Sequence, residues 1–183
     1  MRAAASRAAS GRLREVVTSF VGRRYELAQV KARMSESRAV TLVGAPGVGK
    51  RRLAIRVAEA SRRAFADGVW MVDLTSLDDP DKVADAVLAA LDVCDQSLRP
   101  AAEKLVDHLR DRHALVLVDN CEHVLREAAL LTAHLLRACP RLHVLATSRE
   151  PLDIDGEHIY LVRPLAAPDA AGGPAPHRSL CGT

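Results

Sequence analysis

A lysine that follows a glycine-rich loop is the feature of this sequence most able to do chemistry on phosphate. Residues 40–51 read VTLVGAPGVGKR, an apolar stretch that runs into the loop and reaches Lys50. Glycine lets the backbone approach a polyphosphate closely, and the N–H groups of the loop and of a following helix then point at anionic oxygens. The lysine ammonium reaches the β- and γ-phosphates as a point charge. We therefore predict a phosphate-binding loop made of Gly44, Ala45, Pro46, Gly47, Val48, Gly49, Lys50 and Arg51.

The residue after the lysine departs from this pattern. Its usual type is Ser or Thr, whose hydroxyl coordinates the Mg²⁺ of the nucleotide, but this chain has Arg51. A guanidinium has no acceptor atom and does not ligate a cation. We expect nucleotide binding through the loop backbone to survive this change, whereas Mg²⁺ placement, and with it hydrolysis, is in doubt.

Asp119 stands near the end of a second apolar run. Residues 114–120 read as a strand buried on both faces of a parallel sheet, with the acid at its carboxyl end, where open α/β sheets bind ligands. An aspartate at this position helps to hold Mg²⁺, so we interpret Asp119 as a catalytic residue and metal ligand; a helix cap is the alternative. Glu122 is a further catalytic candidate that could orient water, although a first-turn acid favoured by the helix dipole has the same placement.

Arg149 is the third catalytic candidate and lies at the end of another apolar run, 142–150. An arginine at that strand end senses a γ-phosphate through charge-assisted hydrogen bonds. The alternative is a surface ion pair with Glu150. The seven histidines include no pair at metal-ligand spacing, so histidine supports no metal prediction.

Parallel strands joined by helices are needed to bring these residues to one edge of a sheet. Apolar residues at helical spacing predict a helix before the first strand and helices between the later ones. The pattern predicts an α/β fold with a mainly parallel five-stranded sheet. Its strands are expected at 39–43, 69–74, 114–120, 142–150 and 158–162.

Composition fits this fold and excludes other classes. The chain has 183 residues, enough for one domain with its own core, and 49% are hydrophobic but only 3% aromatic. With 26 basic and 23 acidic residues the net charge is +3, which gives no basis for bulk electrostatic binding to nucleic acid. No apolar run approaches the roughly 18 residues that span a bilayer. The four cysteines lack metal or CxxC spacing and read as reduced residues of a cytosolic protein, three of them in the core.

Both ends of the chain differ from its middle. The first fourteen residues contain four arginines and no acid, and we predict a basic, disordered tail over residues 1–17. From residue 166 the sequence is rich in Ala, Gly and Pro, which predicts a disordered low-complexity tail over 166–183. The nucleotide-binding domain is therefore predicted to span 18–165.

Four motifs, in their order along the chain, resemble the NTPase module of bacterial STAND regulators. This module is of the NB-ARC or AP-ATPase type and occurs in large LuxR-like and SARP-like transcriptional activators. The motifs are FVGR at 20–23, GAPGVGK at 44–50, LVDNCEH at 117–123 and ATSREPL at 146–152. The resemblance implies a three-layer P-loop NTPase with strand order 5-1-4-3-2. It also implies an ATP-driven switch, in which ADP holds the closed state and exchange for ATP opens the protein for assembly.

The resemblance also implies ligands, partners and residue roles. The ligands are ATP or ADP with Mg²⁺, and the partners are other regulator subunits or domains in the cytoplasm, without membrane contact or direct DNA binding by this chain. The family continues into a helical subdomain, a winged-helix domain and repeats, so we expect a truncated relative or a fragment of a longer protein. By position, Arg23 lies near the base and ribose, Lys50 contacts phosphates, Asp119 organises Mg²⁺ and Arg149 reads the γ-phosphate.

The expected function is therefore an ATP- or ADP-binding domain of a STAND-type signalling or transcriptional regulator, with slow or no ATP hydrolysis. The alternative is a non-catalytic interaction module or degenerate remnant, which Arg51 favours and the intact Lys50, Asp119 and Arg149 oppose. A GTPase is a weaker alternative because no Asn-Lys-x-Asp motif follows the fourth strand. A small-molecule kinase would share the loop, but no acceptor-substrate site is identifiable in the sequence.

Overall fold

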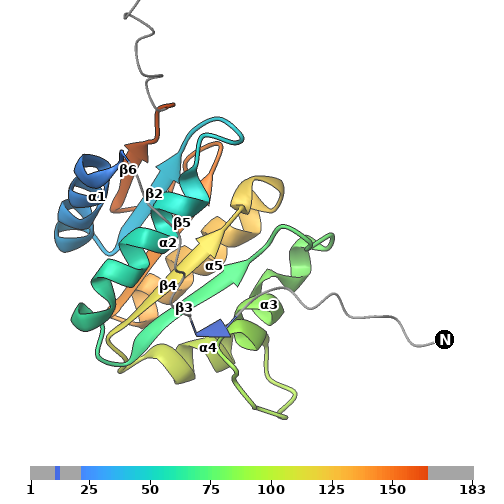
Figure 1. Cartoon of the computed structure of the whole chain (residues 1–183). Coiled ribbons are helices and arrows are strands. Elements are labelled where there is room, and N and C mark those ends of the chain that lie inside the picture. Colours follow the sequence, from blue (N-terminus) through green and yellow to red (C-terminus); the bar gives the residue numbers. More distant parts are fainter. Residues whose placement is uncertain (1–10, 13–21, 165–183) are drawn as a thin grey trace, which may run out of the picture.

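Five parallel strands form the centre of the molecule (Figure 1). The computed structural model of the chain describes residues 11–12 and 22–164. The strands lie in the order β3-β4-β5-β2-β6, and each pair of neighbours is parallel. Both the predicted parallel sheet and the strand order that the resemblance implied are confirmed. The strands are β2 (Ala39–Val43), β3 (Gly68–Asp73), β4 (Ala114–Asp119), β5 (Leu142–Ser148) and β6 (Glu157–Leu161).

A two-residue strand, β1 (Gly11–Arg12), extends the sheet and pairs antiparallel with β3. It belongs to the segment 1–17 for which the sequence predicts a disordered tail. The rest of that segment, residues 20 and 21 of the first motif, and the tail 166–183 lie outside the described residues. Disorder of the two tails therefore stays a prediction.

Helices cover both faces of the sheet (Figure 1). Two pack on one face, α1 (Arg24–Glu36) and α2 (Lys50–Ser61), and three on the other, α3 (Val83–Ala90), α4 (Ala101–Leu109) and α5 (Leu125–Ala138). Local signals set several helix starts, because Asp79 caps the first turn before α3 by accepting from Asp81 N, and Pro100 precedes α4. Single 3₁₀ turns lie at η1 (Arg62–Ala64), η2 (Pro80–Lys82) and η3 (Cys121–His123).

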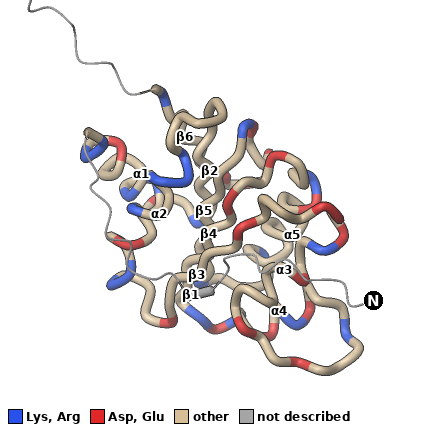
Figure 2. Tube along the Cα trace, turned by 45° about the vertical axis from the view of Figure 1, so that its right-hand side comes forward, with Lys and Arg blue, Asp and Glu red and all other residues tan. Residues whose placement is uncertain are grey.

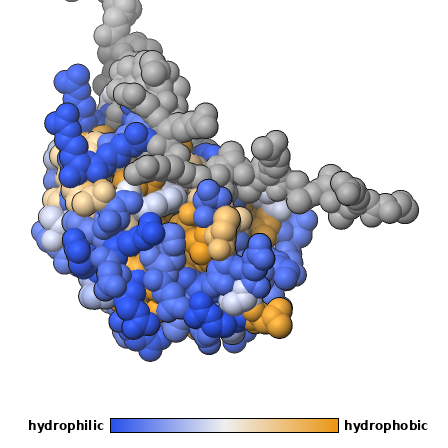
Figure 3. Space-filling model, turned by 90° about the horizontal axis from the view of Figure 1, so that it is seen from below, coloured by the Kyte–Doolittle hydropathy of each residue, from blue (hydrophilic) through white to orange (hydrophobic). Residues whose placement is uncertain are grey.

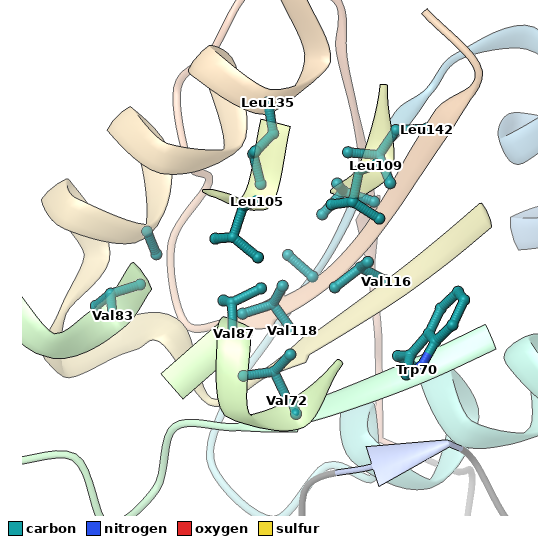
Figure 4. Close-up of a cluster of buried hydrophobic side chains, with 14 of the residues drawn as sticks. Trp70, Val72, Val83, Val87, Leu105, Leu109, Val116, Val118, Leu135 and Leu142 are labelled. Carbon is teal, nitrogen blue, oxygen red and sulfur yellow. The ribbon is translucent and has the colours of Figure 1, made fainter. Parts of the chain in front are cut away.

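The central strands are buried on both faces because alternate side chains enter different cores. In β4, Leu115 and Leu117 pack with α1 and α2, whereas Val116 and Val118 pack with α3, α4 and α5. Figure 4 shows this second core, where helix side chains such as Leu105 meet those of the strands. This two-sided packing explains why the apolar run has no polar residue until the strand ends.

Two of the cysteines occupy the core. Cys121 and Cys139 are buried free thiols. Burial raises the pKa of Cys121 to about 12, so it stays protonated at neutral pH. Cys94, in contrast, is exposed because it lies in the connection between α3 and α4 rather than on a face turned to the sheet. Cys181 lies outside the described residues.

The described surface carries charges of both signs. Figure 2 shows Lys and Arg interspersed with Asp and Glu along the chain. Figure 3 shows a mainly hydrophilic face on which apolar residues form separate patches. Among the helices of residues 22–164, none has the length and apolar character needed to cross a membrane.

Candidate functional site

The predicted phosphate-binding loop joins β2 to α2 at the carboxyl edge of the sheet. Gly47 and Gly49 have φ angles of 74° and 94°, a left-handed conformation that residues with a side chain rarely adopt. Gly49 is the N-cap of the twelve-residue helix α2, and its carbonyl accepts a hydrogen bond from Leu53 N at 3.0 Å. The first N–H groups of a helix have no partner within it. The loop therefore ends at the positive end of a helix dipole, which favours an anion.

Residues far from this loop in the sequence support it on the side away from the pocket. A Cβ atom on Gly44 would lie 2.6 Å from the carbonyl oxygen of Val162, so glycine is required by close packing. Arg23 is only 5% exposed, and its Nη2 donates to Val48 O at 2.6 Å and to Arg163 O at 3.1 Å. Its Nη1 is buried and finds no hydrogen-bond partner in the part of the chain that the structure describes. Arg23 thus joins the loop to the segment after β6.

Lys50 lies against the loop. Its side chain is buried, and Nζ donates to Gly44 O at 2.7 Å and to Ala45 O at 3.2 Å. Both acceptors are neutral carbonyl groups, so these bonds position the ammonium without neutralising its charge.

Arg51 joins two aspartates that end neighbouring strands. Asp73 and Asp119 are partners in the β3–β4 register and therefore stand side by side. Arg51 Nη1 donates to Asp73 Oδ2 at 2.7 Å and also to Asp119 Oδ2. The other two oxygens have partners too, because Thr147 Oγ1 donates to Asp119 Oδ1 at 2.6 Å and Thr75 N donates to Asp73 Oδ1 at 3.0 Å. Both oxygens of each carboxylate are therefore engaged within the protein.

The charges in this cluster stabilise one another. Burial opposes the charge of Arg51, but its hydrogen bond to Asp73 and the negative charges of Asp119 and Asp73 outweigh burial and raise its pKa. Burial also opposes ionisation of Asp73, but hydrogen bonds from Thr75 and Arg51, with the Arg51 charge, lower the pKa of Asp73 below its usual range. Arg51 and Asp73 are therefore both ionised at neutral pH.

A second ion pair lies beside this cluster. Arg149 Nε is 3.3 Å from Glu122 Oε1, with the arginine side chain 59% exposed and the glutamate 17%. Asn120, in the amide orientation that satisfies both groups, donates to Glu122 Oε1 at 3.0 Å. The partner of Arg149 is therefore Glu122 rather than Glu150, the alternative that the sequence suggested. Glu122 is held by two donors and is not an unpaired base.

Most of these groups, although not Asp73, line one pocket of about 600 Å³ at the carboxyl edge of the sheet. Among the described residues, five basic and two acidic side chains line it, so its charge suits a polyanion. The side chain of Ile55 adds an apolar surface. The pocket residues are Pro46, Gly47, Gly49, Lys50, Arg51, Arg52, Ile55, Arg56, Thr75, Asp119, Asn120, Glu122, Thr147 and Arg149.

Eight of the residues that the sequence singled out line this pocket, from Pro46 in the loop to Arg149 after β5. Arg23, Gly44, Ala45 and Val48 do not line it but form or support the back of the loop.

Asp73 and Thr147 were not predicted as residues of the site. Asp73 ends an apolar run in the same way as Asp119, and that signal was available. Thr147 lies inside β5 and carried no comparable signal, because only the sheet brings it to Asp119.

A site made of protein metal ligands is not present in the described part of the chain. No group of three or more His, Cys, Asp and Glu side chains in residues 22–164 is arranged to hold a metal ion.

Comparison with protein families and curated proteins agrees with this geometry. Residues 32–152 match the AAA domain family. The chain is 40% identical to an uncharacterized protein of Mycobacterium tuberculosis, over 84% of this chain and 39% of the relative. It is also 40% identical to a putative HTH-type transcriptional regulator of the same organism, over 78% of this chain and 16% of the relative. Regulatory protein AfsR of Streptomyces coelicolor is 33% identical over 70% of this chain and 13% of its own length. The chain thus spans well under half the length of these relatives.

Solved structures share the fold at low sequence identity. A Signal Transduction ATPase with Numerous Domains (STAND) protein with a tetratricopeptide repeat sensor, from Pyrococcus horikoshii, has a TM-score of 0.56 at 18% identity, over 84% of this chain and 24% of its own. Cdc6p from Pyrobaculum aerophilum has a TM-score of 0.60 at 14% identity, over 81% of this chain and 47% of its own.

Proposed function

This chain belongs to the AAA-domain family of P-loop ATPases, and from that premise we propose that it binds ATP or ADP in the pocket in front of the phosphate-binding loop. The observation that carries the proposal is the loop itself. Two glycines with positive φ lead into α2, and the Lys50 ammonium is held against the loop by neutral carbonyls. In this arrangement the N–H groups at the start of α2 bind phosphate oxygens, and Lys50 contacts the β- and γ-phosphates.

Other residues of the pocket have supporting roles in this proposal. Arg149 meets the γ-phosphate, for which it exchanges part of its contact with Glu122. Arg23 supports the loop on the side away from the pocket, and its contact with base and ribose, which the resemblance implied, stays a prediction. Hydrolysis is slow or absent, because Glu122, the pocket carboxylate proposed to orient water, is already held by Arg149.

The proposed setting is a STAND-type signalling or transcriptional regulator in the cytoplasm. Support comes from the HTH-type regulator and AfsR, both far longer than this chain. In such an assembly this domain reports nucleotide state to other regulator domains or subunits, and DNA contact comes from those parts. As part of this setting, the domain is of the NB-ARC type and the regulator is LuxR-like.

A second candidate is an interaction module without useful nucleotide affinity. Its support is the engagement of both Asp119 oxygens by Arg51 and Thr147, which removes the usual acidic group from a role toward the nucleotide.

The deciding experiment is equilibrium binding of a fluorescent ATP analogue to the chain and to Lys50→Ala. We expect saturable binding by the wild type and at least tenfold weaker binding by the variant. Lys31→Ala, which removes an exposed lysine from α1, is the matched control and should bind as the wild type does. Unchanged affinity in Lys50→Ala would overturn the proposed site, and absence of binding by the folded wild type would favour the interaction module.

A further inference from the structure

The pocket lacks the features that a Mg²⁺ ion needs. Mg²⁺ requires near-octahedral oxygen coordination at about 2.0–2.1 Å, usually from a carboxylate, water and phosphates. In P-loop proteins the hydroxyl after the lysine is one ligand and the strand aspartate helps to hold the ion. Here Arg51 supplies no acceptor, and both Asp119 oxygens are already hydrogen-bonded. The residues present do not fit the ion.

The Arg51 guanidinium lies at the carboxylate that would otherwise hold the ion. Asp119 is 2% exposed and faces Arg51 through Oδ2 and Thr147 through Oδ1. Asp73, from the neighbouring strand, adds a second carboxylate to the same nitrogen at 2.7 Å. A guanidinium that bridges two buried or half-buried carboxylates compensates one of their two negative charges, which weakens the attraction for a second cation.

The charge balance points the same way. Lys50 and Arg51 carry two positive charges and Asp73 and Asp119 two negative charges, so these four groups sum to zero without any metal. With threonine at position 51, the two carboxylates would exceed Lys50 by one charge and would attract a cation.

Arg51 also keeps donors for a ligand. Its side chain is 46% exposed and lines the pocket, and within the described residues it contacts both carboxylates through Nη1. Arginine has five N–H donors in a planar fork that matches phosphate oxygens. Nε and Nη2 therefore remain to donate to a phosphate.

We infer that the Arg51 guanidinium takes the place of the divalent cation, so that this pocket binds the metal-free nucleotide. The inference rests on the proposed function and names the ionic form of its ligand. The Arg51 guanidinium, fixed by Asp73 and Asp119, is thus the cation of this site, whereas related sites bind Mg²⁺ from solution. Excess Mg²⁺ does not strengthen binding, because the Mg²⁺ complex brings a second cation against Arg51.

The test is binding of the fluorescent ATP analogue in EDTA and in excess Mg²⁺, for the wild type and Arg51→Thr. We expect the wild type to bind at least as tightly in EDTA as in Mg²⁺. Arg51→Thr should bind at least tenfold more weakly in EDTA than in Mg²⁺, because its exposed carboxylates then need the ion. Arg63→Thr, at an exposed position after α2, removes the same charge outside the pocket and should behave as the wild type.

The outcomes separate this inference from the function on which it rests. Wild-type binding that weakens tenfold in EDTA would overturn the inference and leave the nucleotide site intact. Absence of binding in both buffers, by a chain shown to be folded by circular dichroism, would overturn the proposed function and the inference with it.

A second measurement tests the ion pair without nucleotide. In a double-mutant cycle of Arg51→Thr and Asp119→Asn, followed by urea unfolding, we expect the two changes to be coupled by about fivefold in the unfolding equilibrium constant. Independent, additive effects would overturn the contact between Arg51 and Asp119.

Discussion

The two halves of the pocket are built in different ways. On the loop side, backbone geometry makes the site, through the positive φ angles of Gly47 and Gly49 and the helix that starts at Lys50. On the strand side, the site depends on side chains, because Asp73 and Asp119 ending β3 and β4 are joined by Arg51.

This difference shows which half tolerates change. Backbone N–H groups bind phosphate whatever the neighbouring side chains are, so a substitution at Arg51 leaves the loop conformation in place. The strand side depends on side chains, so one substitution alters it. Replacing a hydroxyl by a guanidinium adds a positive charge and removes an acceptor at the same time.

The largest effect on nucleotide affinity should come from strain in the loop. Gly49→Ala places a Cβ at φ 94°, and Gly156→Ala does the same at φ 76° in the turn before β6. Each variant should lose about 1–2 kcal/mol of unfolding free energy, the cost of a left-handed residue. Only Gly49→Ala should also weaken binding of the ATP analogue by more than tenfold, because it moves the N–H groups at the start of α2. Equal affinities of the two variants would contradict the backbone origin of this half of the site.

A smaller effect on nucleotide affinity, although not on stability, is expected from the support behind the loop. Arg23→Ala removes the donor to Val48 O and Arg163 O, and lost hydrogen bonds to a charged group cost about 1.5–3 kcal/mol. We expect a loss of stability in that range and a several-fold weaker affinity, measured by urea unfolding and analogue binding. Arg24→Ala, at the exposed neighbouring position, is the control and should change neither. A stable variant with wild-type affinity would show that the loop keeps its shape without Arg23.

The smallest effect concerns the strand side and depends on pH. Because the folded protein lowers the pKa of Asp73, ionised Asp73 stabilises the fold above its usual value of 3.8, and this stabilisation is lost as the pH falls through the lowered folded value. The wild type should therefore exceed Asp73→Asn in unfolding free energy by about 0.5–1 kcal/mol at pH 6, since solvent screens the half-exposed Arg51. The difference should shrink toward zero well below pH 3.8. A difference that does not vary with pH would mean that the ion pair contributes nothing.

Local patterns in the sequence predicted the fold to a large extent. Apolar runs located all five parallel strands, and apolar residues at helical spacing predicted the helices between them, because both patterns involve neighbours in sequence. The loop and Asp119 were found for the same reason, since each stands directly after a strand. The order of the strands came from the family resemblance and not from the residues.

Contacts between distant segments could not be read in this way. Arg23 bonds to Arg163 across 140 positions, and Thr147 bonds to Asp119 across 28. A periodic pattern of apolar residues in the sequence predicts neither contact, because both depend on which strands lie side by side.

The sequence by itself determined that a phosphate-binding loop follows the first long strand, that acidic and basic residues end the later strands, and that an arginine replaces the usual hydroxyl after Lys50. Only the tertiary structure decided where that arginine goes. The β3–β4 register puts Asp73 beside Asp119, and α2 brings Arg51 to both. The energy of an ion pair depends on the distance between its groups, which the sheet sets, and on their charges, which the residue types determine.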